Sequence, residues 1–324
     1  MKNIVVIGGG TGTFTLLTGL KHYDNLSLTA IVTMADDGGS TGELRDEYGT
    51  LPAGDVRQCL IALSTSDLLM RKLFLYRFTS GRLKGHNFGN LLLTALEKIS
   101  GSFDEAIAQA SKVLAVKGKV IPSTIQQTRL VAELENGAIV QGEHNIDEPR
   151  HDGNLRIRKI WLEPKVRLHR AAFEAIRKAD MIVIGPGDLY TSLIPNLLVA
   201  GMAKAIKESR ARKVFVMNLM TKFGQTTGYA ASQHMEALQK YLGSGIDAVI
   251  INTQKPSLEL LSIYRREHEF PVADDFPKSS GKYRIIRKPL LNKSMKSKPG
   301  SDRLRRSLIR HHPQKLSKVV VSLL

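Results

Sequence analysis

Apolar positions along this chain alternate between short continuous runs and stretches with helical spacing. Residues 4–7 form an apolar, β-branched run that predicts a buried strand, and apolar residues return at helical spacing over 14–20. A second run over 26–34 predicts another strand. The same rhythm resumes at 181–184 and continues in "ARKVFVMNLM" and "IDAVIIN". Strands that alternate with helices in this way predict an α/β fold, a Rossmann-like doubly wound parallel sheet in three layers.

The middle of the chain has a different periodicity. "RLVAELENGAIVQGEHNI" alternates apolar and polar residues on both sides of Asn136-Gly137, a strong hairpin signal. "LRIRKIWLEP" adds a further strand. We therefore predict an antiparallel β-rich insertion over 117–168 that covers part of the main sheet and carries no obvious catalytic constellation. The whole chain, 1–324, is expected to form a single α/β domain around it.

The loop after the first strand is rich in glycine. A strand, a glycine loop and a helix together direct backbone N–H groups and the helix dipole at a phosphate, and glycine lets the backbone approach it. Gly8 and Gly10 fit the dinucleotide fingerprint G-x-G-x-x-G, but Thr13 stands where the third glycine belongs. No lysine follows at the spacing of an NTPase P-loop. The loop is thus a phosphate cradle or a tight turn between strand and helix.

The second predicted strand ends in the acidic loop "ADDGGSTGELRDE". Asp36 and Asp37 follow the glycine loop at about the distance where dinucleotide folds place a ribose-binding acid. Adjacent carboxylates also suit a divalent cation that bridges phosphates. The structural alternative is a turn at Asp37-Gly38 with Asp36 as a helix cap.

Three further polar clusters precede helical patterns. Asp55, in "PAGDVRQ", is a plausible N-cap for a helix from Val56, with Arg57 in its first turn able to reach an anion or Asp55. "GHNFGN" gathers donors and acceptors at the start of the next apolar helix. "IGPGDLYTS" repeats the pattern of strand, glycines and helix, with Thr191 and Ser192 as caps or phosphate ligands.

The charge, the apolar run lengths and the cysteine count of the chain make some classes of function unlikely. The formal charge is +17, yet fourteen Lys/Arg and a single acid, Asp302, lie within 278–318, so this basic C-terminal segment carries thirteen of the surplus charges. No zinc-finger, RNP or helix-turn-helix pattern accompanies it, which makes nucleic acid an unlikely partner. No apolar run reaches the length of a membrane span. The single cysteine, Cys59, lies in an apolar helical pattern and suits packing, and we expect a cytoplasmic protein.

Several of these segments together resemble one family. "VVIGGGTG", "ADDGGSTGELRDE", "PAGDVRQ", "GHNFGN", "IGPGDLYTSLIPNLLV" and "IRHHPQKLSKVVVSLL" resemble the gluconeogenesis-factor (YvcK-like) family, within the superfamily of 2-phospho-L-lactate transferases (CofD-like). The resemblance implies a cytoplasmic, dimeric bacterial protein. It also implies a role in carbon-source-dependent growth, cell shape and envelope synthesis, with a UDP-sugar or NAD as the bound ligand.

The resemblance also implies roles for particular residues. The backbone of Gly9, Gly10, Thr11 and Gly12 would hold the diphosphate, and Asp36 and Asp37 would hold Mg²⁺ and act catalytically if the protein is a transferase. The remaining ligand-binding positions implied by the family pattern are Asn87, Asn90, Gly187, Asp188, Thr191, Tyr264 and Arg310. This chain departs from the pattern at His312-Pro313, where relatives typically carry an acid and a threonine.

Two functions from different classes remain open at this stage. One is a nucleotide-sugar-binding regulator that catalyses nothing. The other is a metal-dependent transferase that acts through a nucleotide diphosphate, since phosphoryl-type transfer needs mainly positioning and charge neutralisation. A redox role ranks third, because the third fingerprint glycine and a second catalytic domain are both missing.

Overall fold

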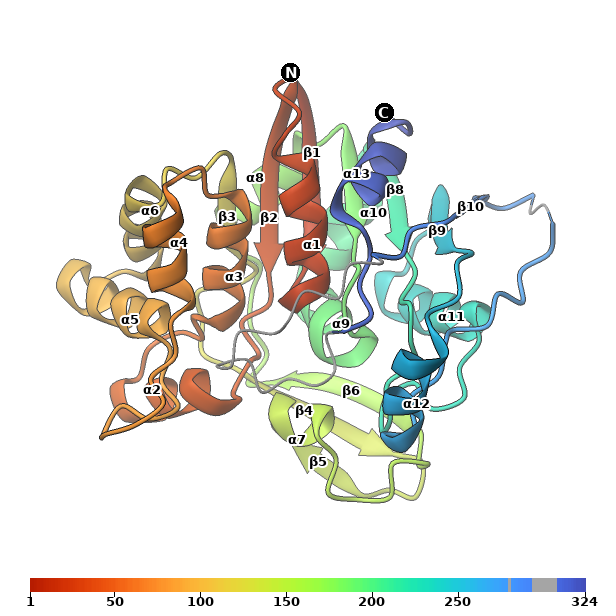
Figure 1. The fold of residues 1–324 in the computed structure, drawn as a ribbon, viewed down its shortest axis with the longest axis horizontal. Helices are drawn as coiled ribbons and strands as arrows, with labels where there is room; N and C mark the ends of the chain where they lie inside the picture. The colour runs from red at the N-terminus through yellow and green to blue at the C-terminus, as the bar shows by residue number, and fades with distance from the viewer. Residues whose placement is uncertain (279–280, 293–307) are drawn as a thin grey trace.

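A computed structural model describes residues 1–278, 281–292 and 308–324. Within them, seven parallel strands form one sheet in the order β10-β9-β8-β7-β1-β2-β3 (Figure 1). All-parallel pairing confirms the predicted doubly wound sheet. The strands are β1 (Lys2–Gly8), β2 (Leu26–Val32), β3 (Lys119–Pro122), β7 (Met181–Ile184), β8 (Arg212–Val216), β9 (Ala248–Asn252) and β10 (Arg284–Lys288).

Helices cover both faces of the sheet because the central strands are apolar on both sides. Ile4 and Val6 of β1 belong to one buried cluster, and Val5 and Ile7 belong to the other. The first cluster is completed by α1 (Gly10–Leu20), α3 (Gly54–Leu63), α4 (Leu68–Leu75), α5 (Phe88–Ser100), α6 (Phe103–Val113) and α13 (Pro313–Val321). The second is completed by α8 (Arg170–Arg177), η1 (Leu189–Leu193), α9 (Ile194–Leu198), α10 (Met202–Glu208) and α11 (Ala231–Leu242).

The insertion forms a separate antiparallel sheet, in the order β5-β4-β6. Its strands are β4 (Arg129–Leu134), β5 (Ile139–Gln141) and β6 (Ile157–Glu163), followed after β5 by the short helix α7 (Glu143–Asp147). Gly137 turns the β4–β5 hairpin with φ +86°. The predicted start at residue 117 was too early, because β3 pairs with β2 in the parallel sheet.

Part of the basic segment 278–318 is integrated into the fold. β10 extends the parallel sheet beside β9, and α13 packs against α1. Between them, the Asn292 amide donates to the Arg310 carbonyl at 2.9 Å, and Leu291 pairs with His311 in an antiparallel bridge. The basic segment is therefore not simply a solvated tail at these elements. Residues 293–307 lie outside the described residues.

The strand order reverses between β1 and β7, since successive strands run from β1 through β2 to β3 on one side and from β7 through β10 on the other. In open parallel sheets, ligands bind beyond the carboxyl ends of the strands at such a switch point. Over the part of the chain that the structure describes, no helix is long and apolar enough to cross a membrane. The two remaining helices are α2 (Gly39–Tyr48) and α12 (Leu258–Arg266).

Candidate functional site

The first glycine loop lies on one side of the switch point. β1 ends at Gly8, and α1 begins at Gly10, whose φ of +63° is a conformation that favours glycine. The Gly10 amide donates to Asp55 Oδ1 at 2.8 Å. A carboxylate therefore already occupies the first amide of the helix N-terminus, where the sequence led us to expect a phosphate. Thr11 and Gly12 contribute the next amides of the same turn.

The loops after β1 and β7 pack backbone against backbone. A Cβ added to Gly12 would lie 2.3 Å from the Pro186 carbonyl oxygen, and one added to Gly9 would lie 2.1 Å from Asp55 Oδ2. Thr13, which replaces the third fingerprint glycine, is fully buried, and its hydroxyl donates to the Pro186 carbonyl at 3.5 Å. The departure from the dinucleotide fingerprint thus serves to join the two loops.

Asp55 is a site residue, and the prediction that it caps a helix was wrong. α3 begins one residue earlier, at Gly54, so Asp55 lies in its first turn and its carboxylate turns back to Gly10. Desolvation, reinforced by the charges of Asp36 and Asp188, raises the pKa of Asp55 to about 7. A carboxyl that titrates near neutrality at a helix N-terminus responds to any cation or anion that binds beside it.

Buried amides connect the acidic loop with the start of α5. Arg57 Nε donates to Asn90 Oδ1 at 2.8 Å, and Asn90 Nδ2 donates to the Thr41 hydroxyl at 3.3 Å. Asn87 caps α5 by accepting the Asn90 amide. Asn87 and Asn90 are each 2% exposed. The structure therefore uses both asparagines to hold the acidic loop in place; direct contact between them and a ligand stays a prediction.

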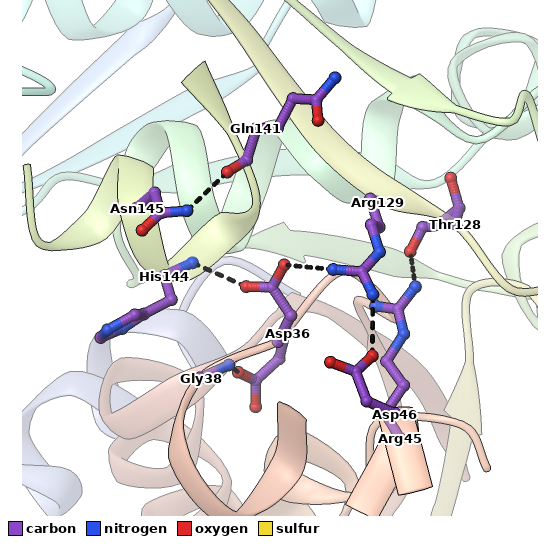
Figure 2. A network of polar contacts seen from close by, with 10 residues as sticks. Asp36, Gly38, Arg45, Asp46, Thr128, Arg129, Gln141, His144 and Asn145 are labelled. Carbon is purple, nitrogen blue, oxygen red and sulfur yellow. Dashed lines mark hydrogen bonds and ion pairs between the residues drawn. The ribbon is translucent and has the colours of Figure 1, made fainter. Parts of the chain in front are cut away.

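Asp36 and Asp37 have different partners. Asp36 accepts the Gly38 amide at 3.0 Å, and desolvation raises its pKa above the ordinary value. Asp37 accepts the His144 amide at 2.9 Å, at the start of α7, and its second oxygen lies 3.9 Å from Arg129. Figure 2 shows Asp36 with Gly38 on the acidic loop and, facing this loop, His144 and Arg129 of the insertion.

The insertion supplies acidic groups to the site, contrary to the expectation that it carries no chemical constellation. Desolvation raises the pKa of Glu143 well above its ordinary value, and the charges of Asp36 and Asp147 add to this effect. Asp147 forms an ion pair with Lys222 at 3.1 Å. Both acids belong to α7, so the antiparallel sheet positions part of the site.

The second glycine loop mainly forms a supporting wall of the site, because its polar groups are bonded to neighbouring residues. Gly187 accepts a hydrogen bond from Asn218 at 2.8 Å, and Thr191 is 3% exposed within the short π-helix η1. The Thr191 hydroxyl accepts from Gln225 Nε2 at 3.3 Å, and Gln225 also donates to Asp147. Asp188 is partly exposed, and its charge raises the pKa of Asp55. Asp188 is therefore the residue of the second glycine loop whose charge acts on Asp55, beside the first glycine loop.

Tyr264 and Arg310 lie together at the β8–β10 side of the sheet. Tyr264 is 3% exposed, and its hydroxyl accepts the Ile309 amide at 3.1 Å. Desolvation raises the pKa of Tyr264, and the positive charge of Arg310, which is next along the chain and partly exposed, opposes this rise. Beside them, desolvation raises the pKa of Glu269 to about 8, with help from Asp188 and Asp147. Tyr264 thus anchors the segment that carries Arg310.

Negative charge accumulates around the switch point although the chain as a whole is basic. The carboxyl groups that influence one another's pKa values there are Asp36, Asp37, Asp55, Glu143, Asp147, Asp188 and Glu269. Nevertheless, no three or more His, Cys, Asp or Glu side chains among the described residues are grouped as a metal centre. One or two carboxylates together with ligand phosphates are the usual Mg²⁺ environment, and Asp36 and Asp55 fit that pattern.

Four acids of this group were not recognised as site residues from the sequence. Asp55 had a local signal, since it follows a Pro-Ala-Gly turn, but that pattern equally predicts a helix cap. Glu143, Asp147 and Glu269 lie in segments with no glycine loop and no helical pattern of their own. These three acids belong to the site only because the insertion and the segment around Phe270 pack against the switch point.

The fold and the site define a class before any relative is considered. This is a doubly wound α/β protein whose two glycine loops meet at the topological switch point, with acidic residues gathered around them. Residues 4–291 match the family described as 2-phospho-L-lactate transferase CofD, and the chain belongs to that family.

Individual relatives give a more particular assignment. The chain is 40% identical to the gluconeogenesis factor of Bacillus subtilis, with 99% of this chain and 98% of that protein covered. It is 48% identical to the gluconeogenesis factor of Halalkalibacterium halodurans over 85% of this chain and 84% of that protein. A crystal structure of a Bacillus halodurans protein superimposes with a TM-score of 0.90 at 42% identity, covering 99% of both chains.

Proposed function

We propose that this protein binds a nucleotide sugar of the UDP-sugar type, with its diphosphate at the first glycine loop, and that it acts as a regulator. The observation that carries the proposal is the convergence of the two glycine loops at the switch point, where Gly12 lies directly against Pro186. Helix N-terminal amides at this place in a doubly wound sheet suit a diphosphate. NAD is the second candidate ligand, because its pyrophosphate has the same requirement.

The charge distribution supports a ligand that arrives with a cation. A diphosphate placed among the carboxylates of Asp36, Asp55 and Asp188 would be repelled unless positive charge offset them. Mg²⁺ bridging Asp36 or Asp55 to the phosphates would supply that charge, as would the guanidinium of Arg310 with its bidentate geometry. We therefore expect Mg²⁺ to strengthen nucleotide binding.

The alternative is a metal-dependent transferase of the 2-phospho-L-lactate transferase type. The family assignment favours it, and Asp36 and Asp37 would then be the catalytic acids. One observation favours the regulator: the carboxylate of Asp37, which would be a catalytic acid, is engaged by the His144 amide. A role in carbon-source-dependent growth, cell shape and envelope synthesis, in the cytoplasm and as a homodimer, belongs to the same proposal.

Isothermal calorimetry with UDP-N-acetylglucosamine tests the binding site. We expect at least about a tenfold loss of affinity in Gly10→Val, because the side chain strains a left-handed backbone at the phosphate-binding turn. A similar loss is expected in Arg310→Ala if its guanidinium holds a phosphate. Gly245→Ala is the matched control, since a Cβ there meets nothing within 4 Å. Unchanged affinity in both site variants would remove the site assignment.

A second measurement separates regulator from transferase. The wild-type protein is incubated with Mg²⁺, UDP-N-acetylglucosamine and an alcohol acceptor, and mass spectrometry is used to look for transfer of the sugar phosphate to the acceptor hydroxyl with release of UMP. Tight binding without product is the expected result. Mg²⁺-dependent turnover that disappears in Asp37→Asn, with binding retained, would establish the transferase in its place.

A further inference from the structure

The surface of α4, which is separate from the two glycine loops in the sequence, is unusually apolar for an exposed helix. We define the α4 surface as the exposed large apolar side chains of α4 and of the loop that follows it. Leu69 is 76% exposed and Leu68 is 60% exposed, on a helix whose opposite side buries Phe74 completely. The members of the α4 surface are Leu68, Leu69, Leu73, Leu75, Tyr76 and Leu83.

The apolar residues of α4 face outward by their spacing. Leu69, Leu73 and Tyr76 lie at the i, i+4 and i+7 separations that place side chains on one helical face, and Leu68 is exposed beside them at the start of α4. α4 lies on the outer side of α3, in the helical layer drawn in orange (Figure 1). The solvent-exposed face of α4 is as apolar as its buried face. Among the described residues, the rest of the chain covers only the buried face.

Hydrogen bonds close the loop that follows α4 and hold its backbone beside the end of the helix. The Phe88 amide donates to the Tyr76 carbonyl at 2.8 Å, and the Phe78 amide donates to the His86 carbonyl at 2.9 Å. Arg77 closes the loop by donating to the Gly85 carbonyl at 2.6 Å. These bonds fix Leu83 and the cations of the loop relative to the helix.

The charge around the α4 surface has one sign. From residue 68 to residue 96 the sequence contains no Asp or Glu, while five cationic side chains occur within 71–84. Asp67, just before this segment, is engaged as the N-cap of α4. Glu43 contacts the segment through its ion pair with His86. The cations are Arg71, Lys72, Arg77, Arg82 and Lys84.

The exposed leucines and the nearby cations together indicate which kind of partner the α4 surface binds. A second copy of the chain in a two-fold interface would place the same five cations opposite one another, which is unfavourable. The apolar members are mostly leucines, which are under-represented at protein-interface hot spots. A leucine-rich face with cations beside it is the composition of a surface that inserts shallowly among anionic lipid headgroups.

We propose that the α4 surface docks onto an anionic membrane, with the apolar side chains entering the headgroup region and the exposed cations Lys72, Arg82 and Lys84 contacting lipid phosphates. The proposal rests on α4 and its loop alone, so it does not depend on the identity of the nucleotide ligand. Docking there would anchor α5, whose first residues hold the acidic loop through Asn90. The protein would then present its switch-point site at a fixed position relative to a bilayer.

A fluorescent label tests insertion directly. Cys59, the single native thiol, is 0% exposed, so Leu69→Cys creates the only accessible thiol for an environment-sensitive dye. We expect the emission to shift to the blue on phosphatidylcholine vesicles containing about 30% phosphatidylglycerol, and to stay unchanged on pure phosphatidylcholine. The control is Leu258→Cys, at an 82% exposed apolar residue that starts α12, on the opposite side of the molecule (Figure 1). No shift at position 69 would overturn the proposal.

A vesicle sedimentation assay adds a second readout. The double variant Leu68→Asp/Leu69→Asp should bind the anionic vesicles at least about tenfold more weakly than wild type, whereas Leu258→Asp should bind like wild type. Because both sites are exposed, the variants should keep the wild-type melting temperature. Equal vesicle binding by both variants would assign the attraction to general basic charge and overturn the proposal. So would a wild-type dimer that the double variant converts to monomer in light scattering, since that result identifies a self-interface.

Discussion

The two glycine loops look alike in the sequence and differ in the structure. The first, after β1, opens an 11-residue helix, and Gly10, Thr11 and Gly12 are partly exposed there. The second, after β7, opens a five-residue π-helix in which Thr191 is buried. α1 presents the aligned amides of a regular first turn, whereas η1, which continues directly into α9, begins with a π-turn. In the second loop the Thr191 hydroxyl is bonded to Gln225 and the Gly187 carbonyl to Asn218.

This difference shows that a glycine can be required by close packing against a neighbouring loop and not by contact with a ligand. Gly12 has no room for a side chain because the Pro186 carbonyl is there, so the second loop shapes the first. Glycine spacing alone therefore does not distinguish a phosphate cradle from the wall that supports it. The following predictions test that division of roles, from the largest expected effect to the smallest.

Gly12→Ala should have the largest effect on stability. Its Cβ would lie 2.3 Å from the Pro186 oxygen and 2.6 Å from the Pro186 carbonyl carbon, both backbone atoms, so the two loops must separate. We expect the free energy of unfolding to fall by roughly 3 kcal/mol, as for overpacked sites. Urea unfolding followed by circular dichroism measures it.

Gly187→Ala is the matched comparison in the second loop. The nearest atoms to its Cβ are side-chain carbons of Leu193 and Ser192 at 3.2 and 3.3 Å, which have room to adjust. A loss of about 1 kcal/mol is expected. If Gly187→Ala costs as much as Gly12→Ala, the two loops are equally constrained and their division into cradle and wall fails.

Asp55→Asn should stabilise the ligand-free protein above neutral pH. The pKa of Asp55 in the folded protein is about 7, above the ordinary 3.8, so ionisation of this carboxyl opposes folding. The penalty is absent below the ordinary pKa, grows as the pH rises between the two values, and is complete above about 7. Asparagine removes it and still offers an oxygen to the Gly10 amide.

We therefore expect Asp55→Asn to raise the free energy of unfolding by a few kcal/mol at pH 8, and to leave it nearly unchanged at pH 4. Urea titrations at both pH values, without divalent ions or nucleotide, provide the measurement. A difference of the same size at pH 4 and pH 8 would show that the effect is not the charge. Asp55→Asn should also weaken the Mg²⁺ dependence of nucleotide binding.

Thr191→Val should have the smallest effect on ligand binding, with a loss of stability of the same size as that of Gly187→Ala. The buried hydroxyl loses one hydrogen bond with Gln225, which should cost about 1 kcal/mol of stability. Because Thr191 supports the wall, the affinity for UDP-N-acetylglucosamine should stay within about twofold of wild type. Calorimetry that shows a tenfold or larger loss, at unchanged stability, would make Thr191 a ligand contact.

Much of the fold was predictable because its strands are buried on both faces. β1, β2, β7, β8 and β9 are continuous apolar runs, and such runs report burial without any knowledge of neighbours. β3 and β10 were not assigned to the sheet. β3 is only four residues long, and β10 is rich in Lys and Arg, because an edge strand is half-exposed and its sequence resembles a loop.

The site was predictable only where a residue lies next to a strand end. Glycines after β1 and acids after β2 mark the carboxyl edge of a parallel sheet, and that much is local information. Asp55 was visible, but its role was misassigned, since a carboxylate near a helix start predicts a cap unless the neighbouring loop is known. The buried positions of Asn87, Asn90 and Tyr264 depend on packing between distant segments.

The sequence by itself determined the parallel α/β core, the hairpin in the insertion, and the two glycine loops, because apolar periodicity and glycine follow from short-range physics. The tertiary structure alone decided that Asp55 occupies the Gly10 amide, that α7 adds Glu143 and Asp147, and that Gly12 fits against Pro186. These features join residues separated by tens of positions along the chain. Their energies come from desolvation and close contact, which exist only after the chain has folded.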